Sequence, residues 1–181
     1  VNPTGPRSCY DESKRFSESL LINFSHQFKI DAKIVRIFNT YGPNMKIDDG
    51  RAVPNFIYQC LKEKDITIYG NGNQTRSFCY VSDMIDGLKK LMASNIIAEP
   101  VNIGNAKEYC SILQLALKIK KMTGAHSKVI HGQMPKDDPV KRKPDTTKAK
   151  KLLGWQPKVN LDKGLRLTID WFREHLQEYR K

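Results

Sequence analysis

Apolar residues recur along the chain at two alternating spacings, one typical of helices and one typical of strands. Residues 10–28 carry apolar side chains at the spacing of one helical face, so this stretch is expected to be a helix. The next stretch, AKIVRIF at 32–38, is rich in β-branched residues and is expected to be a buried strand. Residues 39–50 are full of turn formers and form a loop too long to be a simple connector.

The same alternation continues to the end of the chain. Further helices are expected at 53–64, 82–94, 111–124, 146–153 and 161–179. Further strands are expected at 65–69, 77–81, 101–104 and 128–131. Ser82 and Ser111 are expected helix N-caps, while Gly124 and Gly154 are expected to end helices. Strands that alternate with helices favour an α/β fold with parallel pairing.

The formal charge of +12 suggests an anionic partner, either nucleic acid or a phosphorylated small molecule. The densest block of basic residues runs from 136 to 151, and it also holds three aspartates and no aromatic side chain. That composition fits a nucleic-acid groove poorly, so most of these lysines are expected to face solvent. A nucleic-acid-binding module remains a distant alternative, and a steep salt dependence of DNA binding would reveal it.

Cysteine and histidine are scattered and do not indicate a metal site. No Cys-x-x-Cys pair occurs, and no histidine stands at zinc-ligand spacing to a cysteine. Cys60 and Cys79 lie in apolar stretches and are expected to be small core residues. No apolar run is long enough to cross a membrane, so no membrane contact is expected from this segment.

Tyr10 and Lys14 stand four residues apart at the start of the first expected helix and therefore share one face. A lysine ammonium beside a phenol favours the phenolate, which would let Tyr10 act as a general acid or base. The spacing alone is common by chance, and exposed pairs of this kind are usually inert. The surrounding sequence is what favours a chemical role.

Three segments in order carry a family resemblance: NPTGPRSCYDESKR, RIFNTYGP after the next strand, and YGNGNQTRSFCYVSD. Together they resemble the extended short-chain dehydrogenase/reductases, a family of nucleotide-sugar epimerases, dehydratases and decarboxylases. The family's glycine-rich dinucleotide loop and its Ser/Thr-Glu pair are not in this sequence. The opening residues resemble the middle of a chain, so we expect the C-terminal part of a longer enzyme, inactive alone.

Within the family, RSCYDESKR, MKIDDGRAVPNF and DDPVKRKPD resemble the UDP-glucuronate decarboxylases. Glycine commonly stands at the position of Ser13, a mild departure. The resemblance implies NAD-dependent decarboxylation of UDP-glucuronate through a 4-keto intermediate. A dTDP-glucose 4,6-dehydratase or a UDP-sugar 4-epimerase of the same family remains the alternative.

The resemblance also implies a fold and a domain division. The expected fold is the C-terminal part of a Rossmann-like, doubly wound parallel sheet with a smaller α/β substrate-binding lobe. Residues 1–40 would complete the NAD-binding domain with the Tyr-Lys helix. Residues 41–181 would form mainly the UDP-sugar lobe, with some segments returning to the Rossmann sheet. The intact enzyme would be a homodimer in which the first helix packs against its copy in the partner subunit. Its expected compartment is the cytoplasm, or the Golgi lumen if an upstream anchor exists.

Site residues follow from the matching motif positions. Tyr10 would carry the C4 proton, and Lys14 would hold the nicotinamide ribose. Thr40 would touch the cofactor or the sugar. The substrate would be held by Asn39 at its pyrophosphate, by Arg51 over the sugar and by Tyr69 against the nucleotide. Arg76 would pair with the UDP phosphates, and Arg142 would lie at the phosphates or the carboxylate. The competing interpretation is a turn residue for Asn39 and a solvated loop arginine for Arg51. It is a core residue for Tyr69 and a member of the basic block without a ligand for Arg142.

Overall fold

The computed structural model describes residues 2–47 and 50–177. Its helices are α1 (Ser8–Phe28), α2 (Ala52–Leu61), α3 (Val81–Met92), α4 (Ile112–Thr123), α5 (Thr147–Leu153) and α6 (Leu161–His175). Its strands are β1 (Ile34–Ile37), β2 (Thr40–Tyr41), β3 (Ile66–Tyr69), β4 (Thr75–Ser77), β5 (Cys79–Tyr80), β6 (Pro100–Ile103), β7 (Tyr109–Ser111), β8 (Val129–Gly132) and β9 (Lys141–Arg142). Helices and strands alternate, as the sequence predicts.

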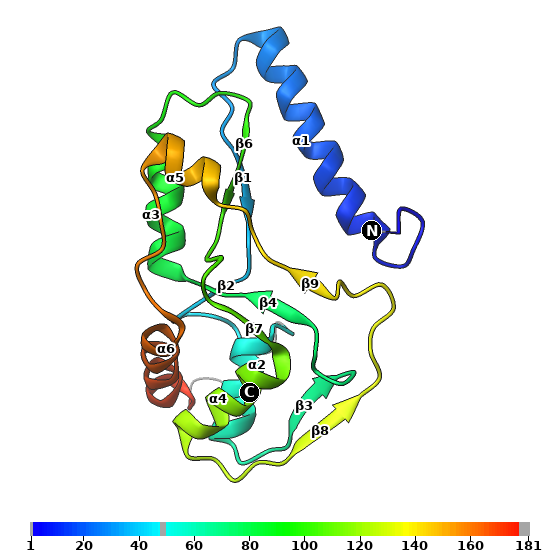
Figure 1. The fold of residues 1–181 in the computed structure, drawn as a ribbon, viewed down its shortest axis with the longest axis vertical. Helices are drawn as coiled ribbons and strands as arrows, with labels where there is room; N and C mark the ends of the chain where they lie inside the picture. Colours follow the sequence, from blue (N-terminus) through cyan, green and yellow to red (C-terminus); the bar gives the residue numbers. More distant parts are fainter. Residues whose placement is uncertain (1, 48–49, 178–181) are drawn as a thin grey trace.

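One half of the molecule is built on the parallel pair of β1 and β6, in the upper part of Figure 1. Helices α3 and α5 cover this pair on one side. Val101 and Ile103 of β6 are fully buried there beside Trp155, whose indole Nε1 donates to the Asp83 backbone carbonyl over 3.0 Å. The buried Cys79 belongs to the same cluster, which confirms its expected role as a small core residue.

The other half holds a larger core between α2, α4 and α6 and the parallel pair of β3 and β8. Its fully buried residues include Ile57, Leu115 and Leu165, one from each helix. Cys60 is buried in this core, again as expected. The described residues thus pack in two separate cores, while the division of the chain into two domains at residue 40 stays a prediction.

Short strands connect the two halves. β2 pairs with β5 in parallel, and β4 lies in the middle of a three-stranded sheet, antiparallel to β7 and parallel to β9. Helix α6 crosses close to β2, where a Cβ on Gly164 would lie 2.1 Å from the Tyr41 hydroxyl oxygen. Glycine is therefore required at this crossing, because only a bare backbone fits.

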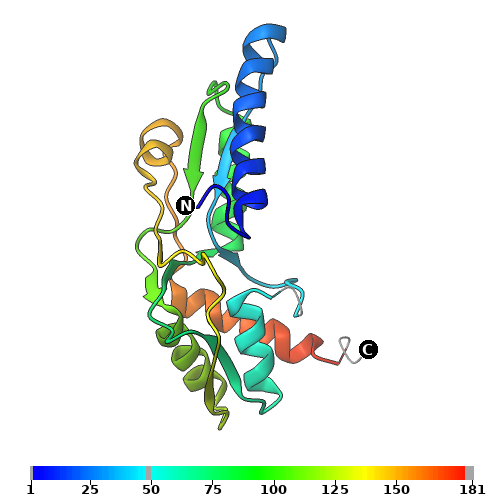
Figure 2. The ribbon, with the colours of Figure 1, turned by 90° about the vertical axis from the view of Figure 1, so that its right-hand side faces the viewer.

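Helix α1 stands beside β1 with its long axis along the edge of the molecule (Figures 1 and 2). Arg36 of β1 pairs with Glu18 of α1, and the Arg36 Nε donates to a Glu18 carboxylate oxygen over 2.8 Å. The remaining apolar face of α1 is uncovered: Phe16 is 66% exposed and Phe28 is 55% exposed. No described helix is long and apolar enough to cross a membrane.

Local sequence signals explain several element ends. Ser111 caps α4 as expected, within a capping box in which the Gln114 N–H donates to the Ser111 hydroxyl over 3.0 Å and the Gln114 side chain accepts from the Ser111 N–H. Gly124 and Gly154 end their helices in the left-handed region, at φ 75° and 57°. Helix α2 ends at Leu61 rather than 64, because Glu63 turns to φ 49°.

Other expectations need correction. Ser82 does not cap α3: the helix begins at Val81 with Tyr80 as N-cap, because β5 runs directly into the helix. The expected strand 77–81 is split into β4 and β5 at Phe78, whose N–H donates to the Glu108 carbonyl over 3.0 Å. Helix α6 ends at His175, four residues before the expected end at Tyr179, which lies outside the described residues. Asp48 and Asp49 of the expected loop also lie outside the described residues.

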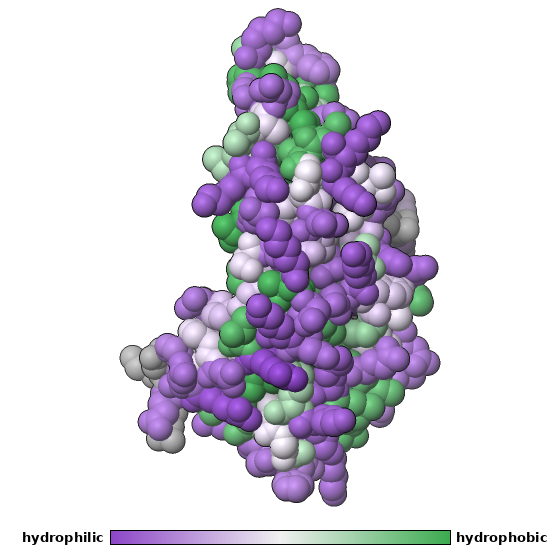
Figure 3. Space-filling view, turned by 60° about the vertical axis from the view of Figure 1, so that its left-hand side comes forward, coloured by the Kyte–Doolittle hydropathy of each residue, from purple (hydrophilic) through white to green (hydrophobic). Residues whose placement is uncertain are grey.

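Most lysines of the basic block face solvent, as the sequence predicts. Lys136, Lys141, Lys143, Lys150 and Lys151 are exposed. Figure 3 shows a largely hydrophilic surface on the side of α3, α5 and α6. The exceptions in the block are the half-buried Lys148 on α5 and the half-buried Arg142 on β9, a strand that the sequence does not predict.

Candidate active site

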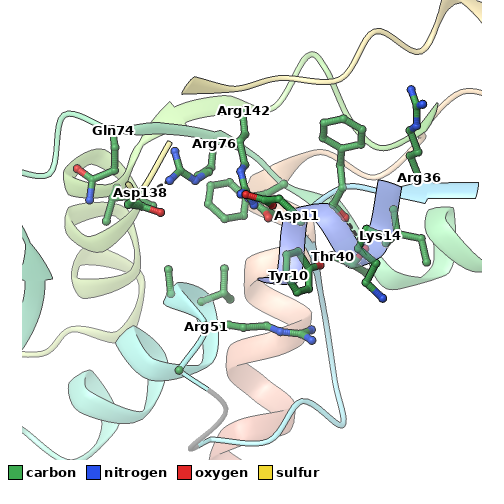
Figure 4. A pocket seen from close by; sticks show the side chains of 18 of the residues that line it. Tyr10, Asp11, Lys14, Arg36, Thr40, Arg51, Gln74, Arg76, Asp138 and Arg142 are labelled. Carbon is green, nitrogen blue, oxygen red and sulfur yellow. Dashed lines mark hydrogen bonds and ion pairs between the residues drawn. The ribbon is translucent and has the colours of Figure 1, made fainter. Parts of the chain in front are cut away.

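A cleft of about 1150 Å³ lies between α1, the end of β1, the start of α2 and the sheet that contains β4 and β9. The structure brings all eight sequence-predicted site residues to its lining. They are Tyr10, Lys14, Asn39, Thr40, Arg51, Tyr69, Arg76 and Arg142. Figure 4 shows that they come from different sides: Tyr10 and Lys14 from α1, Arg51 from the start of α2, and Arg76 and Arg142 from the β4–β9 sheet.

Tyr10 and Lys14 lie on one face of α1, as their spacing predicts. The Lys14 Nζ is 5.6 Å from the centroid of the Tyr10 ring. Tyr10 is 55% exposed, so its hydroxyl is accessible from the cleft. The Ser13 hydroxyl, at the position where the family commonly has glycine, donates to the Tyr10 carbonyl over 2.9 Å and does not interrupt the pair.

Asn39 lies two residues after the end of β1, and Thr40 is the first residue of β2, near the carboxyl end of a parallel strand where ligands approach. The Asn39 carbonyl accepts from the Cys79 N–H over 2.9 Å, which anchors the backbone and leaves the half-buried side chain in the cleft lining. The Thr40 hydroxyl donates to the Phe38 carbonyl over 2.9 Å. Both residues are therefore fixed by backbone contacts at the edge of the cleft.

Arg51 precedes the first residue of α2 and is exposed. In Figure 4 its guanidinium extends toward the side of the cleft that holds Tyr10. The two aspartates before it in the DDGR segment lie outside the described residues. The position agrees with a residue that lies over a bound sugar, but that role stays a prediction.

Arg76 and Arg142 are register partners on the adjacent parallel strands β4 and β9. Side chains at paired positions of neighbouring strands share one face of a sheet, so both guanidinium groups reach the same side. The Arg76 side chain is only 10% exposed and pairs with Asp138 at 2.8 Å. Its other terminal nitrogen donates to the Thr75 carbonyl over 2.9 Å.

Arg142 is half-buried and lies near other positive charges. Burial lowers its pKa from the ordinary value, and the positive charges of Arg7 and Arg76 lower it further. Asp138 and Asp11 act in the opposite direction and only partly compensate. Three arginines against two aspartates leave an excess of positive charge, and an anionic ligand at this end of the cleft would relieve it.

The structure adds residues that the sequence reasoning missed. Gln74 is buried in the cleft lining, and its Nε2 donates to the Tyr69 carbonyl over 2.9 Å while its Oε1 has no hydrogen-bond partner. Asp138 lies in the quoted DDPVKRKPD segment, but only its spatial position reveals that it pairs with Arg76. Tyr69 is 52% exposed in the cleft, so the competing interpretation as a core residue is wrong.

The residues present fit one end of a dinucleotide cofactor. The Lys14 ammonium and the Tyr10 hydroxyl, both on the cleft lining, supply the donors that vicinal ribose hydroxyls require. The glycine-rich turn that holds a dinucleotide pyrophosphate is not in this sequence. In the described ranges, no group of three or more His, Cys, Asp or Glu side chains is placed to hold a metal ion.

Curated relatives match almost the whole chain. A protein from Xenopus tropicalis named UDP-glucuronic acid decarboxylase 1 is 49% identical over 177 residues, covering 98% of this chain and 42% of the relative. A protein from Arabidopsis thaliana named UDP-glucuronic acid decarboxylase 5 is 50% identical over 176 residues, covering 97% of this chain and 51% of the relative. The chain thus spans about half the length of the curated relatives it matches.

Solved structures of nucleotide-sugar enzymes share the fold. A dTDP-glucose 4,6-dehydratase from Streptomyces venezuelae, with NAD bound, superposes with a TM-score of 0.89 at 25% identity over 99% of this chain and 55% of that one. A UDP-glucuronic acid 4-epimerase from Bacillus cereus, in complex with UDP-glucuronic acid and NAD, gives 0.81 at 34% identity over 87% of this chain and 50% of that one. The expected Rossmann-type α/β fold is thereby confirmed.

A family model described as GDP-mannose 4,6 dehydratase matches residues 1–168, which include every predicted site residue. The match, the relatives and the shared fold agree with the motifs around Tyr10, Thr40 and Arg76. The chain therefore belongs to this family of extended short-chain dehydrogenase/reductases.

Proposed function

We propose that the full-length protein is an NAD-dependent UDP-glucuronate decarboxylase that forms UDP-xylose. The observation that carries the proposal is the cleft itself, in which a Tyr-Lys pair faces a pair of arginines. The decarboxylase names of relatives at 44–50% identity favour this reaction over the epimerase and dehydratase reactions of structures at 19–34% identity.

The proposed reaction needs a ketone beside the carbon that loses its carboxylate. Direct loss of CO₂ from C5 would leave an unstabilised carbanion, whereas a ketone at C4 lets the departing electron pair delocalise as an enolate. Bound NAD⁺ would oxidise C4 at the start and be restored when C4 is reduced at the end. Overall, CO₂ leaves, C5 gains a proton, and no net oxidant is consumed.

Tyr10 is the proposed acid and base at C4. It would take the C4 hydroxyl proton during oxidation and return a proton during the final reduction. Its exposed ring at the start of α1 supports this role, because the hydroxyl can reach a ligand in the cleft. Lys14, whose Nζ lies 5.6 Å from the centroid of the Tyr10 ring, would hold the nicotinamide ribose beside it.

Arg76 and Arg142 are the proposed diphosphate ligands, with Asn39 at the same group. Guanidinium groups bind phosphate oxygens in bidentate pairs, and two in register offer a broad cationic surface. Arg142 also lies on the way toward Tyr10 in Figure 4, beside Asp11. It could therefore stabilise the enolate or deliver the C5 proton through water.

Thr40, Arg51 and Tyr69 complete the proposed site. Thr40 follows Asn39 at the strand end and would contact the cofactor or the sugar. Arg51 approaches from α2 and would lie over the sugar. Tyr69 offers an exposed aromatic face on which a nucleobase can pack.

Product analysis tests the proposal. The full-length protein is incubated with UDP-glucuronate and catalytic NAD⁺, and the nucleotide sugars are identified by mass spectrometry and NMR. UDP-xylose with CO₂ and no accumulated NADH is the expected result. UDP-galacturonate alone would identify an epimerase, and a 4-keto-6-deoxy product from dTDP-glucose would identify a dehydratase.

We further propose that the full-length protein is a homodimer that pairs α1. This helix exposes Phe16, Leu20 and Phe24, with Ile22 half-buried, which is more apolar surface than one contact stripe needs. Sedimentation of the full-length protein at micromolar concentration should give twice the chain mass. A monomeric mass would contradict the proposal.

A further inference from the structure

We propose that Gln74 is a specificity residue for the nucleobase: its side-chain oxygen accepts a hydrogen bond from the imide N–H of a uracil in the cleft. The inference rests on the proposed function for the position of the diphosphate at Arg76 and Arg142. The family resemblance gives Gln74 no role.

A buried acceptor without a donor lies on the cleft lining. Gln74 is only 7% exposed, and it belongs to that lining. Its Oε1 is buried and has no hydrogen-bond partner among the described residues. Leaving a buried acceptor unpaired costs free energy, so a ligand that brings a donor to this oxygen gains affinity from it.

The protein fixes the orientation of the Gln74 amide. Its Nε2 donates to the Tyr69 carbonyl over 2.9 Å, and a carbonyl can only accept, so the nitrogen and the oxygen of the amide cannot exchange places. The Gln74 backbone is held as well, because its carbonyl accepts from the Ile112 N–H over 3.0 Å. The free oxygen is therefore a preorganised acceptor.

Gln74 lies at the nucleoside end of the cleft. It precedes Arg76 by two residues, and Figure 4 shows it on the far side of Arg76 from Tyr10. With the diphosphate at Arg76 and the reacting sugar at Tyr10, the nucleoside occupies the opposite end of the cleft, beside Gln74.

The surroundings of Gln74 suit a flat base. Tyr69, whose carbonyl holds the Gln74 amide, has a side chain that is 52% exposed in the same lining, to which the apolar Ile112 also belongs. A base that packs on the Tyr69 ring presents its polar edge to neighbouring side chains. The N3–H of uracil is a donor that matches Oε1. N3 of cytosine is an acceptor, so a cytosine in the same place would leave Oε1 unpaired.

Titration calorimetry on the full-length protein tests the assignment with UDP, CDP and 2′-deoxy-UDP. Wild type should bind UDP about tenfold or more tightly than CDP, because CDP lacks the N3–H donor. Gln74→Met has a similar length and no acceptor, so the UDP affinity should fall about tenfold and the preference over CDP should disappear. Asn73→Met, at an exposed neighbour outside the cleft lining, is the matched control and should keep the wild-type preference.

The ratio of affinities separates recognition from a structural role. Gln74→Met also loses the hydrogen bond to the Tyr69 carbonyl, and a general defect of this kind would weaken UDP and CDP equally. Gln74→Glu keeps an acceptor at the same length and should keep the preference for UDP, although its charge weakens both nucleotides.

An unchanged preference for UDP over CDP in Gln74→Met would overturn the inference, as would a wild type without that preference. A substitution that changes only the ratio of UDP to 2′-deoxy-UDP would place the donor on the ribose and contradict the assignment to the base. If the protein does not decarboxylate UDP-glucuronate but its preference for UDP depends on Gln74 as expected, the proposed function fails and the inference stands.

Discussion

Arg76 and Arg142 face each other in register on β4 and β9, two parallel strands that come from segments more than sixty residues apart in the sequence. Like charges at paired positions normally destabilise a sheet. Here Asp138 pairs with Arg76 at 2.8 Å, while burial and the neighbouring arginines lower the pKa of Arg142. The sheet thus holds the two cations close together at a position where a diphosphate would neutralise both.

Replacing Arg142 tests this arrangement. Arg142→Gln should weaken UDP binding to the full-length protein by about tenfold or more, because a charge-assisted bidentate contact is lost. Titration calorimetry with UDP measures the change. Lys150→Gln removes an exposed charge of the basic block and is the matched control. Equal losses in the two variants would mean that only net charge matters.

Asp83 holds a loop to α3 and should be required for stability. Its carboxylate accepts from the N–H groups of Lys158 and Val159 over 3.0 and 2.8 Å, and it is buried. Asp83→Ala should lower the free energy of unfolding by about 2–4 kcal/mol, because two backbone donors lose their acceptor. Urea unfolding of the full-length protein measures it. Asp86→Ala, on the exposed side of the same helix, should change stability by less than about 0.5 kcal/mol.

The crossing of α6 over β2 should not tolerate a side chain at Gly164. A Cβ there would meet the Tyr41 hydroxyl oxygen at 2.1 Å and its ring carbon at 2.8 Å. Gly164→Ala should therefore destabilise the protein by about 1–3 kcal/mol, the usual cost of overpacking. Adding Tyr41→Phe removes the hydroxyl and should recover part of that loss. Strictly additive effects of the two substitutions in thermal unfolding would contradict the packing argument.

Cysteine alkylation should depend on pH in a site-specific way. Burial raises the pKa of the Cys110 thiol to about 11 and that of Cys79 to about 12, because the apolar surroundings disfavour the thiolate. Below those values both thiols stay protonated in the folded protein and should react slowly with iodoacetamide, whereas the exposed Cys9 reacts without hindrance from burial. Peptide mapping after timed alkylation measures the three rates. Rapid labelling of Cys79 at neutral pH would contradict the fold.

The same two thiols should affect stability at alkaline pH. Burial raises the pKa values of both thiols in the folded state. Their contribution to the free energy of unfolding is therefore fully present below the ordinary thiol pKa of about 8.5, and it is lost as the pH rises toward 11–12. The free energy of unfolding of the full-length protein should thus fall over this range. Cys79→Ala should make the fall smaller, and an identical pH dependence in that variant would contradict the assignment.

Local signals in the sequence predict much of this fold. Ser111 with Gln114, and Gly124 after the last apolar residue, define α4 from both ends. The i, i+4 spacing places Tyr10 and Lys14 on one face. Each of these relations depends on a few neighbouring residues, so it can be recognised without knowing the tertiary structure.

Contacts between distant segments could not be predicted in this way. Strand β9 is two residues long and lies in a basic block, and it exists because it pairs with β4. The pairing of Asp138 with Arg76 depends on the same long-range contact. Ser82 has the composition of an N-cap, but the direct passage from β5 to α3 moves the helix start by one residue. Tertiary structure decides these features, and composition alone favours the wrong answer.

The most direct measurement uses UDP-glucuronate that carries deuterium at C4. If C4 is oxidised and then reduced within one turnover, the full-length protein with catalytic NAD⁺ should form UDP-xylose that keeps the deuterium at C4, as NMR of the product will show. UDP-xylose with hydrogen at C4, or UDP-galacturonate in its place, would contradict the account.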